Sequence, residues 1–229
     1  MGSLSVTITL PLPFWHVNVP EHARTPQCPP FLLDLSPKDL RTVSTPDADY
    51  RPQSWDDVCR LIRANSLERF QRVPSHLRRY KAFTYRLART HGSIANFVLR
   101  ERLRWDVPVV PRGNAPFQCD DDVKILFNDW PYGLDRRIVH LVVWTKFELK
   151  ASSATGDLTD EARKEIDDFV TDKFRSRMPD NQVMWFKNWA ALKSIHAVEH
   201  FHVMLFDPDP DFIREVTNGD VPQCDKADI

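Results

Sequence analysis

The sequence predicts an α+β fold built around an antiparallel sheet. Three observations support this prediction. Apolar residues recur at helical spacing between residues 54 and 105. Short β-rich segments replace them after residue 122, and a single helical segment separates the second of these from the third. With 229 residues, of which 42% are hydrophobic, the chain can bury one large core.

Residues 1–53 are rich in proline and show no helical or strand periodicity. Large apolar residues, among them Phe14, Trp15 and Phe31, interrupt the prolines. A disordered segment would contain fewer such residues. We therefore predict an ordered arm that packs over the main body.

Residues 54–110 are predicted to form a basic helical region packed on the core. Ser54 is a candidate N-cap followed by acidic residues. A second helix carries Leu77–Leu87 and stops near Gly92, and a third covers Ser93–Trp105.

The many arginines of this region allow two interpretations, an anionic partner such as nucleic acid or ordinary solvated helix faces. They alternate with apolar positions as in any amphipathic helix, and the formal net charge of the chain is only −1. We therefore expect no nucleic-acid partner.

Residues 111–229 are predicted to be an α+β core with an acidic C-terminal tail, and we expect the arm, the helical region and this core to form one compact unit. The expected order is strand, strand, helix, strand, strand. The segments are Val123–Asn128, Ile138–Trp144, a helix opening at Thr159, Val183–Phe186 and Phe201–Phe206.

No apolar stretch approaches the roughly 18–20 residues of a membrane span. Pro11 and Pro13 interrupt the apolar run near the start, so we expect neither a cleaved signal nor a membrane partner. The four cysteines are scattered without a CxxC pair, which is typical of reduced thiols. We expect the cytoplasm, with the nucleus as a second location.

The first candidate site lies on the last predicted strand. Alternation places His200 and His202 on one face together with Met204. Such a pair can supply a nucleophile and a proton relay, or can be structural. His196 and Glu199 add potential metal ligands, but one strand cannot aim Glu199 and His200 at the same ion. We predict no metal and no cofactor.

The second candidate site follows the first predicted strand. Asn128 and Asp129 could hold sugar hydroxyls, and Trp130 and Tyr132 could stack on a ring. Lys146, at the end of the next strand, could meet a phosphate. A tight turn explains Asn, Asp, Pro and Gly equally well, although not two aromatic residues.

Several tryptophan-containing segments resemble a fungal family named N-acetylglucosamine-induced proteins, whose biochemical activity is unknown. The resemblance covers most of the chain. It is carried by Phe14–Pro20, Pro74–Tyr80, Asn128–Gly133, His140–Phe147, Trp185–Lys193 and Glu199–Leu205.

Residues 123–206 also resemble a histidine-triad (HIT-like) nucleotide hydrolase or transferase domain, which has the same element order. The resemblance implies His202 as the nucleophile toward an α-phosphate and His200 as the first triad histidine. It further implies substrate contacts from a second set of residues: Asn128, Asp129, His140, Lys146 and Asn188.

Two departures weaken this resemblance. Met204 stands at the third triad position, and methionine cannot donate a hydrogen bond to a phosphate oxygen. The usual glycine-containing segment before the triad is also absent, so Lys193, Ser194 or His196 would have to replace its donors. Two hypotheses remain: a nucleotide or nucleotide-sugar hydrolase or transferase, and a non-catalytic protein that senses a sugar or nucleotide or binds a protein partner.

Overall fold

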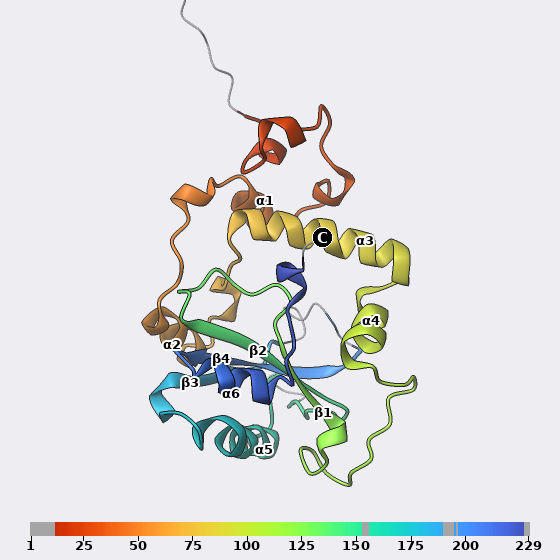
Figure 1. Cartoon of the computed structure of the whole chain (residues 1–229), viewed down its shortest axis with the longest axis vertical. Coiled ribbons are helices and arrows are strands. Elements are labelled where there is room, and N and C mark those ends of the chain that lie inside the picture. Colours follow the sequence, from red (N-terminus) through yellow and green to blue (C-terminus); the bar gives the residue numbers. More distant parts are fainter. Residues whose placement is uncertain (1–11, 153–155, 190–194, 196, 227–229) are drawn as a thin grey trace, which may run out of the picture.

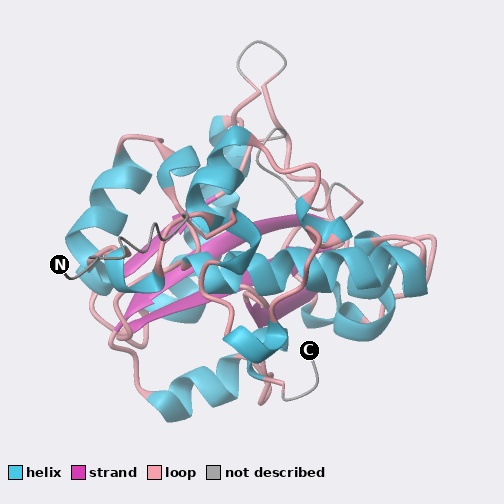
Figure 2. Ribbon diagram, turned by 90° about the horizontal axis from the view of Figure 1, so that it is seen from above, coloured by secondary structure: helices cyan, strands magenta, loops and turns pink. Residues whose placement is uncertain are grey.

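The computed structural model describes residues 12–152, 156–189, 195 and 197–226. Its centre is a four-stranded, fully antiparallel sheet with strand order β1-β2-β4-β3. The strands are β1 (Val123–Phe127), β2 (Ile138–Thr145), β3 (Val183–Phe186) and β4 (Glu199–Phe206). Helices pack on both faces of the sheet (Figures 1 and 2), so the α+β prediction is confirmed.

The strand register determines which side chains share a face. Trp144 pairs with His200, Val142 with His202, and His140 with Met204. Directly paired residues point to the same side of an antiparallel sheet. The histidines of β2 and β4 therefore lie on one face, and the residues between them on the other.

The face without histidines is a dry apolar core. Phe201, Val203 and Leu205 of β4 are completely buried there. They pack against α5 (Asp160–Val170) and α6 (Pro210–Val216), below the sheet in Figure 1. The predicted helix opening at Thr159 is confirmed, since its hydroxyl accepts a hydrogen bond from the Ala162 amide.

The histidine face is covered by the helices that precede the sheet in sequence. These are α1 (Pro37–Val43), α2 (Trp55–Arg63), α3 (Pro74–His91) and α4 (Ile94–Phe97). In Figure 1, α3 crosses above the sheet with α1 above it, and α4 lies at the β1 side. Both faces of the sheet are thus buried, because helices from the two halves of the chain cover opposite sides.

The helix ends follow local chemistry. Ser54 and Asp57 form a reciprocal capping box at the start of α2. Gly92 ends α3 in the left-handed conformation, with φ of 74°. Pro74 does not interrupt this helix but begins it, because its missing N–H is not needed in the first turn. The predicted third helix is a short α4 continued by π-helical Val98–Leu103.

Residues 12–53 contain short 3₁₀ turns and one short helix, α1, and the rest of the segment is irregular. They contact α3: Arg78 donates to the Trp15 carbonyl at 2.9 Å, and Lys81 pairs with Asp39 at 2.6 Å. Within the described ranges, no helix is long and apolar enough to cross a bilayer.

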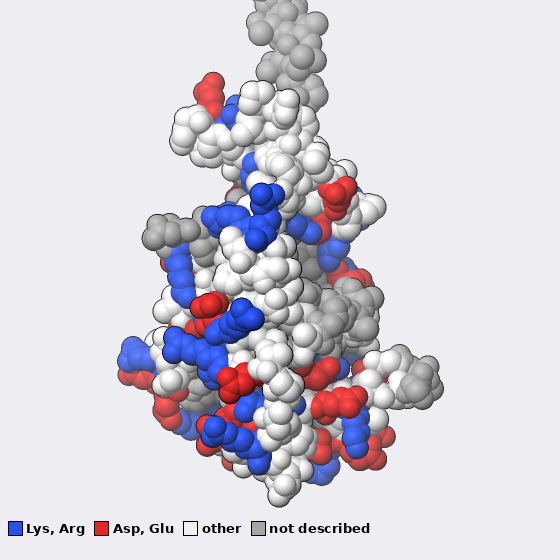
Figure 3. Space-filling view, turned by 90° about the vertical axis from the view of Figure 1, so that its right-hand side faces the viewer, with Lys and Arg blue, Asp and Glu red and all other residues white. Residues whose placement is uncertain are grey.

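The basic side chains of the helical region are largely occupied. Arg102 binds two carboxylates, while Arg72 and Arg79 donate to backbone carbonyls. On the side of the molecule shown in Figure 3, blue side chains are interspersed with acidic and uncharged surface instead of forming one continuous patch.

Candidate functional site

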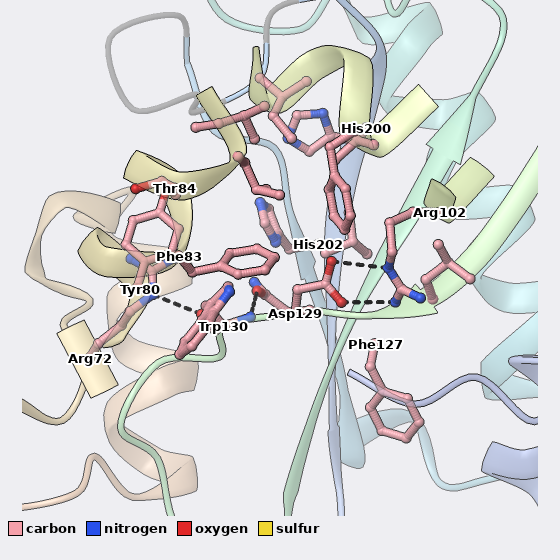
Figure 4. Close-up of a pocket in the computed structure, with 18 of the residues that line it drawn as sticks. Arg72, Tyr80, Phe83, Thr84, Arg102, Phe127, Asp129, Trp130, His200 and His202 are labelled. Atoms are coloured by element: carbon pink, nitrogen blue, oxygen red, sulfur yellow. Dashed lines mark hydrogen bonds and ion pairs between the residues drawn. The ribbon is translucent and has the colours of Figure 1, made fainter. Parts of the chain in front are cut away.

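A cavity of about 480 Å³ lies between the histidine face of the sheet and helices α3 and α4. Its volume is in the range of small-molecule sites. His200 and His202 of β4 and Trp130 after β1 line it (Figure 4). Asn128 after β1 and Asn188 after β3 line it as well. The structure therefore brings together residues from both candidate sites predicted above.

His202, which lines the cavity, forms a buried pair with His140, which is not itself among the lining residues. His140 Nε2 and His202 Nδ1 are 3.0 Å apart, and both side chains are almost inaccessible to solvent. One of these two nitrogens must carry the shared hydrogen. The orienting partner of His202 is thus His140, not its strand neighbour His200.

His200 faces a different environment. Its Nδ1 lies 3.0 Å from the Val198 carbonyl, and its ring centre is 4.5 Å from that of Trp144. The rings of His200 and His202 are 5.7 Å apart in an edge-to-face arrangement. The predicted face shared by the two histidines is correct, yet a direct relay between them is not present.

Asparagine side chains contact both histidines of the pair. Asn128 Oδ1 accepts the Trp130 amide at 2.9 Å, which leaves its Nδ2 to donate toward His140 Nε2 at 3.2 Å, the same nitrogen that faces His202 Nδ1. Asn188 Nδ2 is 3.2 Å from His202 Nε2, the nitrogen of His202 that points away from His140. Both ring nitrogens of His202 are therefore engaged.

The histidine pair is held in the neutral state. Burial lowers the pKa of His140 to about 3, assisted by the positive charge of Arg72. Burial also lowers the pKa of His202 well below its ordinary value, followed by the effects of His140, His200 and Arg72. A neutral imidazole keeps one nitrogen lone pair available.

Asn188 is 7% exposed and has an unused hydrogen-bonding atom. Its Oδ1 is buried without a partner, while its Nδ2 serves His202. Trp130 Nε1 is a second buried donor without a partner. Since buried polar atoms are almost always paired, these two atoms mark places where a ligand can bind.

Arg72, which the sequence interpretation did not single out, lines the same cavity. Its Nε donates to the Trp130 carbonyl at 2.8 Å, and its guanidinium lies 4.1 Å from the Tyr80 ring centre. No carboxylate among the described residues forms an ion pair with it. Its place in the sequence, before α3 in a stretch with many arginines, does not distinguish Arg72 from its neighbours. Only the folded structure shows that it lines a cavity together with two histidines.

Tyr132 lies beside the histidines rather than in an exposed turn. Its ring stacks on His140 at 5.1 Å and on Phe70 at 4.9 Å between ring centres. Burial raises the pKa of its hydroxyl, so the group stays protonated. Tyr132 thus lines the cavity, as does Trp130, whose ring makes tilted contacts with Tyr80 and Phe83.

The Asp129 carboxylate is engaged in contacts with other parts of the chain. Its carboxylate pairs with Arg102, which also binds Asp220 through two hydrogen bonds of 2.8 Å (Figure 4 draws the Asp129 contacts). Asp129 also accepts the Gln223 amide at 3.0 Å. Burial raises its pKa, against the opposing effect of Arg102.

Lys146 lies outside the cavity lining. It pairs with fully buried Asp122 at 3.1 Å and lies over the Trp105 ring. Lys193, Ser194 and His196 lie outside the described residues. In the part of the chain that the structure describes, no three His, Cys, Asp or Glu side chains converge as metal ligands.

Comparison with known proteins gives a family and a fold. The model of a protein family of unknown function, DUF3605, matches residues 54–206. N-acetylglucosamine-induced protein 1 of Candida albicans is 27% identical over 187 residues, which are 73% of this chain and 74% of that protein. An uncharacterized protein of Saccharomyces cerevisiae is 27% identical over 159 residues, 67% of this chain and 79% of its own length.

Among solved structures, the crystal structure of HTC1 superimposes with a TM-score of 0.61 at 24% identity. It covers 72% of this chain and 94% of the HTC1 chain, which indicates a shared fold. The resemblance to the fungal N-acetylglucosamine-induced proteins is confirmed by the sequence relatives. The chain belongs to the DUF3605 family of proteins of unknown function.

Proposed function

We propose that the protein binds a small organic anion, in the first place a phosphate ester, in the cavity above His140 and His202. The observation that carries this proposal is Arg72, a guanidinium lining the cavity with no carboxylate partner among the described residues. Guanidinium groups bind phosphates and carboxylates through paired hydrogen bonds. Trp130, which also lines the cavity, adds a neutral donor through its unpartnered Nε1.

Nucleotides and nucleotide sugars are the phosphate esters that a HIT-like domain would take. Two features support a HIT-like assignment of this chain: the order of its strands and helix, and the place of His202 on the last strand. The name of the Candida albicans relative connects that protein with N-acetylglucosamine. On this basis, nucleotide sugars belong in the first set of ligands to test.

Met204 cannot contact the ligand. It is completely buried in a cluster that includes Val58, Leu61 and Phe70, beneath α2. A histidine at this position would lie in an apolar core without a partner, at a cost in stability. Arg72 can supply the positive charge that the third triad histidine would provide in HIT-like domains that have it.

A second candidate function is nucleotidyl transfer through His202. The hydrogen-bonded His140–His202 pair favours it, because a neutral, oriented imidazole can act as a nucleophile. In such a step His202 Nε2 would form a bond to the α-phosphorus, and the phosphorus–oxygen bond to the leaving group would break. The departing oxygen would take a proton, and water would then cleave the phosphorus–nitrogen bond.

The Asn188 amide controls this chemistry. When its Nδ2 donates to His202 Nε2, the hydrogen of His202 is on Nδ1 and the Nε2 lone pair exists. An acceptor at position 188 would place the hydrogen on Nε2 and remove that lone pair. Attack also requires the amide to move aside, since it occupies the approach to Nε2.

Binding is tested by calorimetric titration of the chain with nucleotides, nucleotide sugars and amino-sugar phosphates. Replacing Arg72 with Gln removes the charge and should weaken binding by about tenfold or more. Arg69→Gln is the matched control, because Arg69 is exposed and outside the cavity lining. Equal affinities for the two variants would contradict the anion site.

Catalysis is tested on the same ligands by product analysis. If His202 attacks, His202→Ala and Asn188→Asp should abolish turnover, whereas Asn188→Ala leaves Nε2 free and should retain part of it. Binding with no product from the unaltered chain would exclude transfer and leave the binding proposal intact.

A further inference from the structure

The cavity has two chemically different ends. At the polar end, Arg72, Trp130 and Asn188 carry the unused hydrogen-bonding capacity described above. The other end is enclosed by a set of apolar side chains from α3, α4 and the sheet. These are Leu87, Phe97, Val98, Leu126, Val142 and Trp144.

The register of the sheet explains this division. Leu126 pairs with Val142, and Val142 pairs with His202, so the floor changes from polar to aliphatic across neighbouring strands. The roof over the aliphatic part comes from Leu87 of α3, Phe97 of α4 and Val98 of the π-helical segment that follows α4. This end of the cavity is therefore lined by an apolar cluster and not by hydrogen-bonding side chains.

Polar side chains near the apolar end are already occupied. Thr84 Oγ1 donates to the Lys81 carbonyl at 3.1 Å. His200 Nδ1 faces the Val198 carbonyl at 3.0 Å. A nucleobase or sugar buried there would bring several polar atoms, and polar atoms buried without partners weaken binding. A hydrocarbon would instead gain from leaving water.

We propose that the ligand is amphipathic, with a phosphate or carboxylate head at Arg72 and a hydrocarbon body lying over Leu126 and Val142. This inference rests on the proposed anion site and narrows its ligand. The head receives hydrogen bonds from the Arg72 guanidinium and from Trp130 Nε1. The body fills the space under α4.

The test compares heads and bodies by isothermal titration of the full chain. The probes are octyl phosphate, octanoate, adenosine monophosphate and glucosamine 6-phosphate. We expect octyl phosphate or octanoate to bind at least about tenfold more tightly than the two polar phosphates. The two octyl probes together decide whether the head is a phosphate or a carboxylate.

Two variants locate the binding. Arg72→Gln should weaken the octyl probes by about tenfold, and the control Arg69→Gln should not. Val142→Phe narrows the apolar end and should weaken the octyl probes by about tenfold or more, with an unchanged unfolding temperature. Octyl binding that is indifferent to Val142→Phe would overturn the inference.

The failures of the two proposals are distinguishable. If adenosine monophosphate or glucosamine 6-phosphate binds more tightly than both octyl probes and depends on Arg72, the amphipathic ligand is wrong and the anion site stands. If no probe binds in an Arg72-dependent manner, both proposals are wrong.

Discussion

The two faces of the sheet use the same four strands for different purposes. Towards α5 and α6, Phe201, Val203 and Leu205 are fully buried in a continuous apolar core. Towards α3 and α4, the alternate residues His200 and His202 are buried beside a cavity. One strand thus packs one set of side chains into the apolar core and lines the cavity with the other. The predictions below test this division, beginning with the largest expected effect.

Removing a large side chain from the dry face should have the greatest effect. Phe201→Ala is expected to lower the free energy of unfolding by about 3–5 kcal/mol, because it leaves a cavity among Phe117, Phe169 and Trp185. Urea unfolding measures this loss. The control Leu33→Ala, at a position 64% exposed, should change stability by less than about 0.5 kcal/mol. A small effect at Phe201 would mean that this face is not the main core.

Acid should act on the histidine face. In the unfolded chain a histidine titrates near 6.5, whereas burial lowers the pKa of folded His140 to about 3. The unfolded state then binds more protons below pH 6.5. The stability from His140 is complete above that pH and is lost as the pH falls toward 3, by about 1.4 kcal/mol per pH unit.

Urea unfolding between pH 7 and pH 4 checks this slope. His140→Gln should flatten it, and the same substitution at exposed His22 should leave it unchanged. Identical slopes for the two variants would show that the histidine face does not govern the acid response.

Adjacent valines of β2 provide a sharper comparison. Val143→Phe inserts a ring into the packed face and should destabilise the protein by about 1–3 kcal/mol. Val142→Phe extends into the cavity and should change the free energy of unfolding by less than about 0.5 kcal/mol. Denaturant midpoints for the pair measure the difference. Equal losses would mean that the cavity is closed in solution.

Helix caps should have similar effects on the two faces, smaller than the loss expected at Phe201. Ser54→Ala at α2 and Thr159→Ala at α5 each remove one capping hydrogen bond, worth about 1 kcal/mol. Thermal unfolding of both variants measures these losses. A much larger loss at Ser54 would indicate that α2 holds the histidine face more firmly than its cap implies.

Strands and caps were readable from the sequence because they depend on local chemistry. The strand prediction Val183–Phe186 agrees with the structure, and the Ser54 cap and the Gly92 stop are where expected. Helices α1 and α6 were not predicted. They are short and lie in proline-rich or acidic segments, although Ser36-Pro37 and Asp209-Pro210 are recognisable helix starts.

The candidate site was predictable only in part. Asn128, Trp130, Asn188 and His202 were named from the sequence and converge on one cavity. The pairing of His202 with His140, 62 positions away, depends on strand register, which no local pattern specifies. Arg72 was missed for the same reason, since its neighbours in the cavity are distant along the chain.

The contacts of Asp129 and Arg102 with Asp220 and Gln223 join segments that leave the ribosome at different times. Arg102 and Asp129 emerge from the ribosome early, whereas Asp220 and Gln223 follow much later; Gln223 lies 94 positions after Asp129. Until then, the loop after β1 lacks the backbone amide and the second carboxylate that hold it. The wall of the cavity formed by the loop after β1 is therefore completed late in synthesis, after every strand of the sheet has been made.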